Sequence, residues 1–126
     1  MREAARARSR AHAPYSRFPV GAALLARSGR VIQGCNVENA SYGLGVCAER
    51  AAIFRALSEG ERDFVAIAVT GKPGRGAPPC GACRQVLHEF APKLVVLYRD
   101  RRGRLVRRRL DQLLPDAFDF PSRRGR

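Results

Sequence analysis

The sequence lacks any hydrophobic run long enough to cross a membrane. Its longest apolar stretches, residues 65–69 and 94–98, are only as long as strands, whereas a membrane-spanning helix needs about 20 apolar residues. The Arg-rich N-terminus also lacks the apolar segment of a secretory signal. We therefore expect a cytoplasmic protein without a membrane partner.

Acidic residues are scarce, since 11 Asp and Glu stand against 24 Lys and Arg, for a formal net charge of +13. Only Lys72 and Lys93 among the basic residues are lysine, and arginines crowd residues 99–109. Such a charge attracts nucleic acid without sequence specificity. However, no aromatic residue interleaves with the arginines of 99–109, which argues against a platform that stacks single-stranded bases. A nucleic-acid partner is therefore allowed but not established, and a solvated, Arg-biased surface is the simpler interpretation.

Cysteine is also sparse, with four in 126 residues, so the chain is not a disulfide-stapled secreted scaffold. The Cys80/Cys83 pair has C-x-x-C spacing, which is typical of metal binding or of a thioredoxin-like redox pair. A redox pair would give no role to Cys47 or Glu49. The three thiols of Cys47, Cys80 and Cys83 instead predict a zinc site that leaves one coordination position for water, as catalytic zinc sites do.

Glu49 stands two residues after Cys47, so we expect its carboxylate at the edge of the metal site, where it would carry protons. Three thiolates leave Zn²⁺ with an excess negative charge, which opposes acidification of a bound water. Arg50 and the N-termini of two helices, expected to begin near Cys47 and Cys80, would offset that charge. These residues predict hydrolytic chemistry.

The pattern of apolar residues predicts one domain, residues 1–126, in which helices alternate with strands, followed by a polar, Arg-rich tail at about 119–126. No internal repeat or linker is visible. The order predicts an α/β fold, a sheet of about five strands with helices on both faces. The predicted helices are 2–13, 47–58, 81–90 and 110–114, and the predicted strands are 20–26, 31–36, 64–70, 94–98 and 105–109.

Five blocks of sequence, at 15–24, 34–40, 47–49, 79–85 and 113–118, together resemble the small homotetrameric cytidine deaminases, and they span nearly the whole chain in order. The resemblance implies a three-layer α-β-α sandwich with a mixed five-stranded sheet and one Zn²⁺ per subunit. It also implies hydrolytic deamination of cytidine and deoxycytidine to uridine and deoxyuridine, with release of ammonia, in pyrimidine salvage.

The resemblance also assigns residues to a nucleoside substrate. Asn36 and Glu38 match the pair that holds the ribose hydroxyls, which suits an amide and a carboxylate with complementary donors and acceptors. Phe18 matches an aromatic residue that packs against the pyrimidine ring. The backbone of Ala48, with Glu49, would recognise the base.

Further matches concern neighbouring subunits and the metal. Ala40, Tyr42 and the C-terminal Phe118 match positions that reach a neighbouring subunit's site, which implies a homotetramer with shared sites. Arg50 matches an arginine that donates hydrogen bonds to the zinc thiolates, in agreement with the charge argument above.

Three alternatives stay open at this point. The chain could deaminate another aminopyrimidine nucleoside, or cytosine within a polynucleotide, although sites closed by Tyr42 and Phe118 would leave no groove for flanking nucleotides. A structural-zinc, nucleic-acid-binding module without catalysis would need a fourth protein ligand, for which Cys35 is the candidate. We expect Cys35 to be a buried thiol outside the metal site. His12 and His88 are expected to pack or to face solvent.

Overall fold

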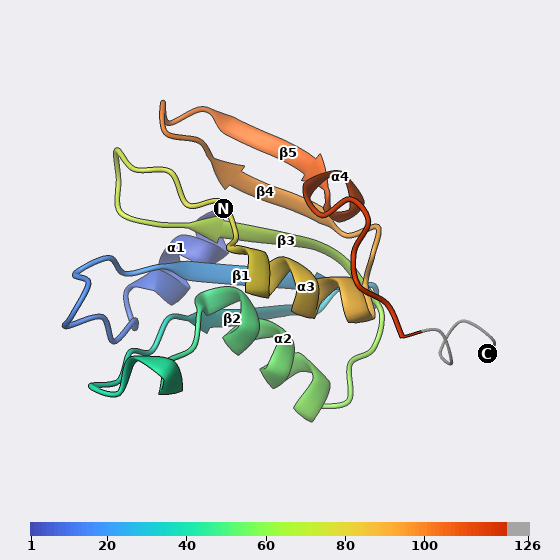
Figure 1. Cartoon of the computed structure of the whole chain (residues 1–126), viewed down its shortest axis with the longest axis horizontal. Helices are drawn as coiled ribbons and strands as arrows, with labels where there is room; N and C mark the ends of the chain where they lie inside the picture. The colour runs from blue at the N-terminus through green and yellow to red at the C-terminus, as the bar shows by residue number, and fades with distance from the viewer. Residues whose placement is uncertain (121–126) are drawn as a thin grey trace.

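The computed structural model describes residues 1–120, which form a mixed five-stranded sheet with helices on both faces (Figure 1). The strands are β1 (Gly21–Ala26), β2 (Val31–Cys35), β3 (Phe64–Thr70), β4 (Val95–Arg99) and β5 (Leu105–Arg109). The helices are α1 (Arg2–Arg8), α2 (Ala48–Ser58), α3 (Gly81–Phe90) and α4 (Leu110–Leu113), with a 3₁₀ turn, η1, at Tyr42–Leu44. The predicted α/β architecture is confirmed, whereas the end of the predicted tail, residues 121–126, lies outside the described residues.

Strand order in the sheet is β2-β1-β3-β4-β5. The β1–β2 and β4–β5 pairs are antiparallel hairpins, and β1 also pairs antiparallel with β3. The β3–β4 pair is parallel, so it needs a crossover, and α3 supplies it. No helix within residues 1–120 is long and apolar enough to span a membrane.

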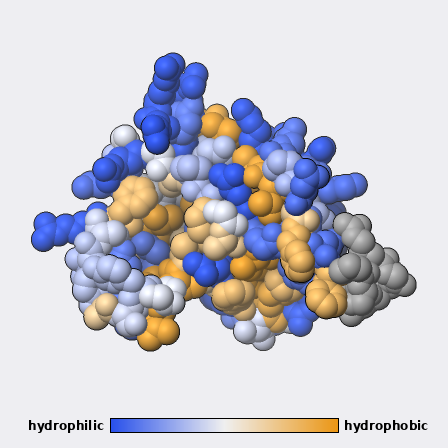
Figure 2. All heavy atoms as spheres, in the orientation of Figure 1, coloured by the Kyte–Doolittle hydropathy of each residue, from blue (hydrophilic) through white to orange (hydrophobic). Residues whose placement is uncertain are grey.

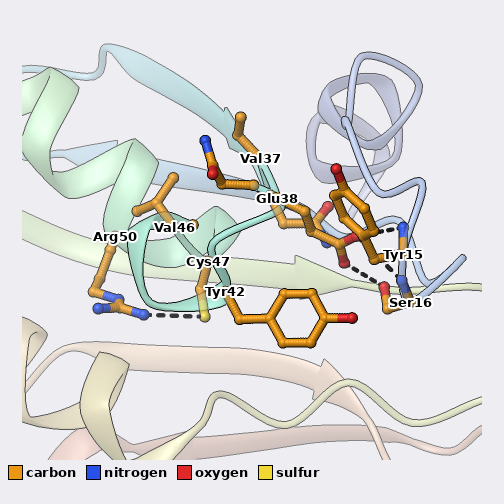
Figure 3. A pocket seen from close by; sticks show the side chains of 11 residues that line it. Tyr15, Ser16, Val37, Glu38, Tyr42, Val46, Cys47 and Arg50 are labelled. Atoms are coloured by element: carbon orange, nitrogen blue, oxygen red, sulfur yellow. Dashed lines mark hydrogen bonds between the residues drawn. The ribbon is translucent and has the colours of Figure 1, made fainter.

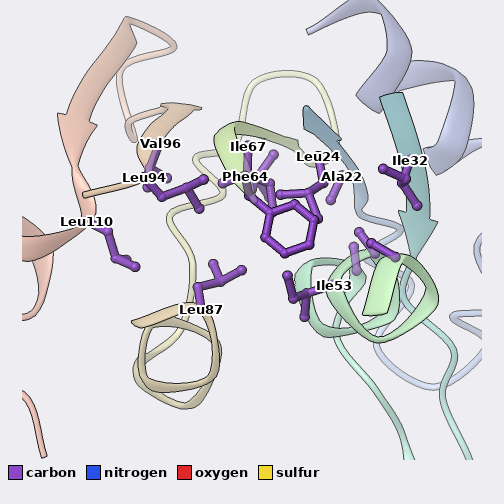
Figure 4. Close-up of a cluster of buried hydrophobic side chains, with 14 of the residues drawn as sticks. Ala22, Leu24, Ile32, Ile53, Phe64, Ile67, Leu87, Leu94, Val96 and Leu110 are labelled. Carbon is purple, nitrogen blue, oxygen red and sulfur yellow. The ribbon is translucent and has the colours of Figure 1, made fainter. Parts of the chain in front are cut away.

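The main core lies between the sheet and the face formed by α2 and α3 (Figure 4). Ile53 of α2 and Leu87 of α3 are fully buried against Leu24, Ile67 and Val96 of the sheet. Each such side chain contributes about 1.5–3 kcal/mol by burial. A smaller cluster under α1 holds the opposite face of the sheet. The core therefore fixes both helices whose N-termini carry the predicted metal ligands.

The first helix is shorter than predicted, because it ends at Arg8 rather than at residue 13. Beyond it the chain pairs with the segment that follows β2: the His12 amide donates to the carbonyl of Asn36 (2.9 Å), and the Glu38 amide donates to the carbonyl of His12 (2.8 Å). These long-range bonds replace helical ones. They bring the 12–20 segment beside Asn36 and Glu38.

A close approach between β2 and α2 depends on Gly34. A Cβ atom at this position would lie 2.5 Å from the amide nitrogen of Ala52 and 2.6 Å from the carbonyl oxygen of Ala48. Any other residue would push α2 away from the sheet. Gly34 therefore lets the first turn of α2, which carries Glu49, pack closely against β2.

Candidate metal and substrate site

Three thiols converge where two helices begin. Cys47 and Cys80 are the N-cap residues of α2 and α3, and Cys83 lies in the first turn of α3. Their sulfur atoms all lie within 4.8 Å of one another, and the Cys47 and Cys80 sulfurs are 4.0 Å apart. Tetrahedral zinc with Zn–S bonds of 2.3 Å holds its sulfurs about 3.8 Å apart. The geometry and the softness of the donors both fit zinc.

Hydrogen bonds set which thiol loses its proton first. The Cys83 thiol and the Arg50 guanidinium, whose Nη2 is 3.4 Å from the Cys47 sulfur, lower the pKa of Cys47 to about 5. The same hydrogen bond to Cys47, together with burial, raises the pKa of Cys83. Hydrogen bonding within the cluster therefore favours the thiolate form of Cys47, and metal binding would require the remaining thiols to lose their protons as well.

Glu49 is the one charged residue within 1–120 that is buried, with 4% of its surface exposed. Burial raises the pKa of its carboxyl group to about 7, and the negative charge of Cys47 acts in the same direction. A carboxyl group with a pKa near neutrality can both accept and return a proton. Its place one turn from the thiols suits the predicted role in proton transfer.

A cavity of about 410 Å³ opens beside Cys47 and Arg50 (Figure 3). Asn36, Glu38 and Tyr42 line it as well. A volume of this size accommodates a small-molecule ligand. The structure thus brings the two predicted ribose-binding residues and one metal ligand to a single cavity.

Glu38 has internal partners that the sequence does not reveal. Its Oε1 atom accepts hydrogen bonds from the amides of Tyr15 (2.9 Å) and Ser16 (3.1 Å), and the Ser16 hydroxyl donates to Oε2. The Ser16 hydroxyl lowers the pKa of the Glu38 carboxyl most strongly. A carboxylate offers about four lone-pair sites, so one stays free for a ligand.

Asn36 is tied to the same segment. Its Oδ1 atom accepts from the amide of Val20 (2.8 Å), and its Nδ2 donates to the carbonyl of Phe18 (3.0 Å). The Ser16 hydroxyl, in turn, accepts from the amide of Phe18 (3.0 Å). Asn36 and Glu38 therefore also hold the loop that carries Phe18. Ser16 is a member of the site that we did not predict, and its spacing two residues before Phe18 is the signal of a serine turn.

Phe18, Ala40 and Phe118 do not line the cavity of the single chain. Phe18 is half-buried under the Arg75 guanidinium, which is 5.6 Å from its ring centroid. Ala40 is exposed, as is Phe118, whose carbonyl accepts from Gln85 (2.9 Å). Tyr42, by contrast, lines the cavity, where its ring makes a tilted contact with the ring of Tyr15, at 5.9 Å between centroids and 60° between planes.

Ala48 is fully buried at the start of α2, as expected for a residue that would act through its backbone. Cys35 does not join the thiol cluster within residues 1–120. The expectation that Cys35 is buried is wrong, because it is half-exposed at the end of β2, which is an edge strand of the sheet.

A three-thiol metal site, a buried carboxyl group with a pKa near 7 and an adjoining polar cavity define a zinc-dependent hydrolase. Residues 1–99 match the family described as the cytidine and deoxycytidylate deaminase zinc-binding region. The chain belongs to this deaminase family.

Individual relatives agree with that assignment. The chain is 54% identical over 119 residues to a cytidine deaminase of Halalkalibacterium halodurans, covering 94% of this chain and 90% of the relative. It is 46% identical over 124 residues to a cytidine deaminase of Mycobacterium tuberculosis, covering 96% and 90%. The crystal structure of a cytidine deaminase from Burkholderia pseudomallei superimposes with a TM-score of 0.87 at 52% identity, covering 93% of this chain and 94% of that one.

Proposed function

We propose that this chain catalyses the hydrolytic deamination of cytidine and deoxycytidine, which yields uridine or deoxyuridine and ammonia. The observation that carries the proposal is the meeting of the Cys47, Cys80 and Cys83 thiols with buried Glu49, beside a cavity lined by Asn36 and Glu38. The names of the relatives support the same reaction. Pyrimidine salvage in the cytoplasm is our expectation for the cellular role.

The chain's own groups supply the proton transfers. When zinc is bound by Cys47, Cys80 and Cys83, it acidifies a water molecule and so provides the nucleophile. The Glu49 carboxylate would accept one proton of the attacking water and deliver it to the ring nitrogen. It would then carry the second proton, from the hydroxyl group on the attacked carbon, to the departing amine, which leaves as ammonia. Its pKa of about 7 allows both transfers near neutral pH.

Arg50 would balance the charge of the ligands. Three thiolates on a divalent cation carry a net charge of −1, and Arg50 donates to the Cys47 sulfur at 3.4 Å. The N-termini of α2 and α3, each capped by a ligand cysteine, add partial positive charge. These contributions favour deprotonation of the water that the reaction needs.

Four substrates distinguish the alternatives: cytidine, deoxycytidine, cytosine within an oligonucleotide and a second aminopyrimidine nucleoside. Purified protein with zinc should release ammonia from cytidine and deoxycytidine much faster than from cytosine within an oligonucleotide, because Tyr42 and Phe118, exposed in the single chain, would close neighbouring subunits' sites against flanking nucleotides. Faster turnover of the oligonucleotide would favour a polynucleotide deaminase. Faster turnover of the other aminopyrimidine nucleoside would instead identify that nucleoside as the preferred substrate.

The Glu38→Gln substitution tests ribose recognition. Loss of the charged acceptor should raise KM for cytidine about tenfold, because a hydrogen bond to a charged group is worth about 1.5–3 kcal/mol. Turnover of free cytosine, which has no ribose, serves as the control. If the substitution impairs deamination of cytidine and of cytosine equally, Glu38 acts only by holding the Tyr15–Ser16 backbone.

The chain presents apolar surface suited to self-association. Hydrophobic residues gather on the face that α2 and α3 cover (Figure 2), and Tyr42, Leu44 and Phe118 are 79%, 75% and 70% exposed. Exposed patches of this kind mark interaction sites. We propose a homotetramer in which Ala40, Tyr42 and Phe118 complete neighbouring sites.

Dilution tests that assembly. Specific activity should fall as the protein is diluted below the dissociation constant of the tetramer, in step with the loss of the tetramer in analytical ultracentrifugation. The Phe118→Ala variant should dissociate at a higher concentration than the parent, because it loses apolar contact area. A monomer that retains full specific activity would contradict shared sites.

A further inference from the structure

A second cavity, of about 360 Å³, lies between α1 and the loop that follows β3. The charged residues that line it are all basic, and we call it the basic cavity: Arg2, Arg8, Lys72, Arg75 and Arg99. No carboxylate lines it within residues 1–120. Two other cavities have a mixed lining, since Glu38 lines the one beside Cys47 and Asp63 lines another beside Arg27 and Lys93. A third, lined by Phe18, Arg75 and Arg101, adjoins the basic cavity through Arg75 and, among the described residues, also lacks a carboxylate, so the basic surface continues there.

The charges of the basic cavity have no acidic partner among residues 1–120. Within the described part of the chain, none of its five cationic side chains forms an ion pair, whereas six arginines elsewhere do so. Among residues 1–120, Arg8 donates to the carbonyl of Gly71 and Arg99 to the carbonyl of Gly103, and both acceptors are neutral. Like charges in a concave surface focus a positive potential and raise the local concentration of anions.

We propose that the basic cavity binds an oligophosphate group, either the phosphate chain of a free nucleotide or consecutive phosphates of a single-stranded nucleic acid. Guanidinium groups match phosphate oxygens with two parallel hydrogen bonds. Several cations around one cavity match an anion that carries several charges. Hydrophilic side chains also dominate the neighbouring surface above the β4–β5 turn (Figure 2).

The basic cavity adjoins the residue assigned to the pyrimidine ring. A Cβ atom at Gly71 would lie 2.8 Å from Cζ of Phe18, and the Gly71 carbonyl accepts from Arg8. Arg75 lies over the Phe18 ring at 5.6 Å, in a cation–π contact. An anion that draws Arg75 into the cavity would loosen Phe18 and raise KM for the nucleoside. This coupling, unlike the binding itself, rests on the proposed function.

The test measures binding of tripolyphosphate and of an oligothymidylate by titration calorimetry, in phosphate-free buffer at low salt and without nucleoside. The Lys72→Glu/Arg75→Glu variant should bind tripolyphosphate about tenfold more weakly or worse, because it loses two charged donors. The control, Arg107→Glu/Arg108→Glu, changes the net charge equally but alters exposed residues of β5 outside the cavity. It should bind within about twofold of the parent.

Competition between the two ligands distinguishes the two sources of phosphate. Competition between the oligothymidylate and tripolyphosphate identifies nucleic acid as a source of the phosphate, whereas tripolyphosphate binding without competition identifies a free nucleotide. Equal losses in both variants, or no saturable binding of tripolyphosphate, would overturn the site. Because the measurement needs no deamination, it is independent of the proposed activity.

Discussion

The Glu49→Ala substitution should lower kcat for cytidine by about a thousandfold while one zinc ion stays bound per subunit. The loss follows from removal of the group that moves protons, an effect worth about 10²–10⁴ in rate. Zinc stays because the three thiols, which lie within 4.8 Å of one another, do not need the carboxylate. Ammonia release and elemental analysis of the purified variant measure the two quantities.

The Glu49→Gln substitution isolates the loss of the carboxylate, because it keeps the shape of the side chain. Its matched control is Glu59→Gln, the same change at the opposite end of α2, where the carboxylate pairs with Arg30 and Arg55 at the surface. The control should keep kcat, since surface ion pairs contribute about 0–1 kcal/mol to stability. Undiminished deamination by Glu49→Gln would refute the proton-transfer role.

The Cys83→Ser substitution should abolish both zinc binding and deamination. Cys83 is fully buried among the other thiols, and a hydroxyl is a poor substitute for a thiolate ligand of zinc. When the free zinc concentration is 100 times the dissociation constant, zinc binding stabilises the native state by about 2.7 kcal/mol. The variant should therefore lose the rise in melting temperature that zinc gives the parent protein.

Cys35→Ser is the matched control for that experiment. Cys35 lies outside the thiol cluster, so the variant should keep its zinc and its turnover. This result also separates catalytic from structural zinc, because a non-catalytic module with four protein ligands would need Cys35. Loss of zinc from the Cys35 variant would support that module.

The metal ligands and the helices and strands that flank them in sequence were predictable because local signals mark them. Proline and glycine before Cys80 end the preceding loop, and the observed α3 and β3 have the predicted bounds. The end of α1 was not predictable from its Ala- and Arg-rich sequence. His12 leaves the helix for a bridge to Val37, and such a long-range pairing overrides helix propensity.

The chemistry of Glu49 was only partly predictable. Its spacing from Cys47 indicates proximity to the metal, but its pKa near 7 arises from burial, which depends on how α2 packs against the sheet. The bonds from Ser16 to Glu38 join residues 22 positions apart. No sequence periodicity indicates such a contact, so only the structure shows that Glu38 also holds the segment that contains Ser16.

The most direct test of the central claim is a zinc titration of metal-free protein, with ammonia release from cytidine as the readout. Activity should rise in proportion to added zinc and reach a plateau at one zinc per subunit, with one uridine formed for each ammonia. Full occupancy of zinc without release of ammonia would contradict that claim.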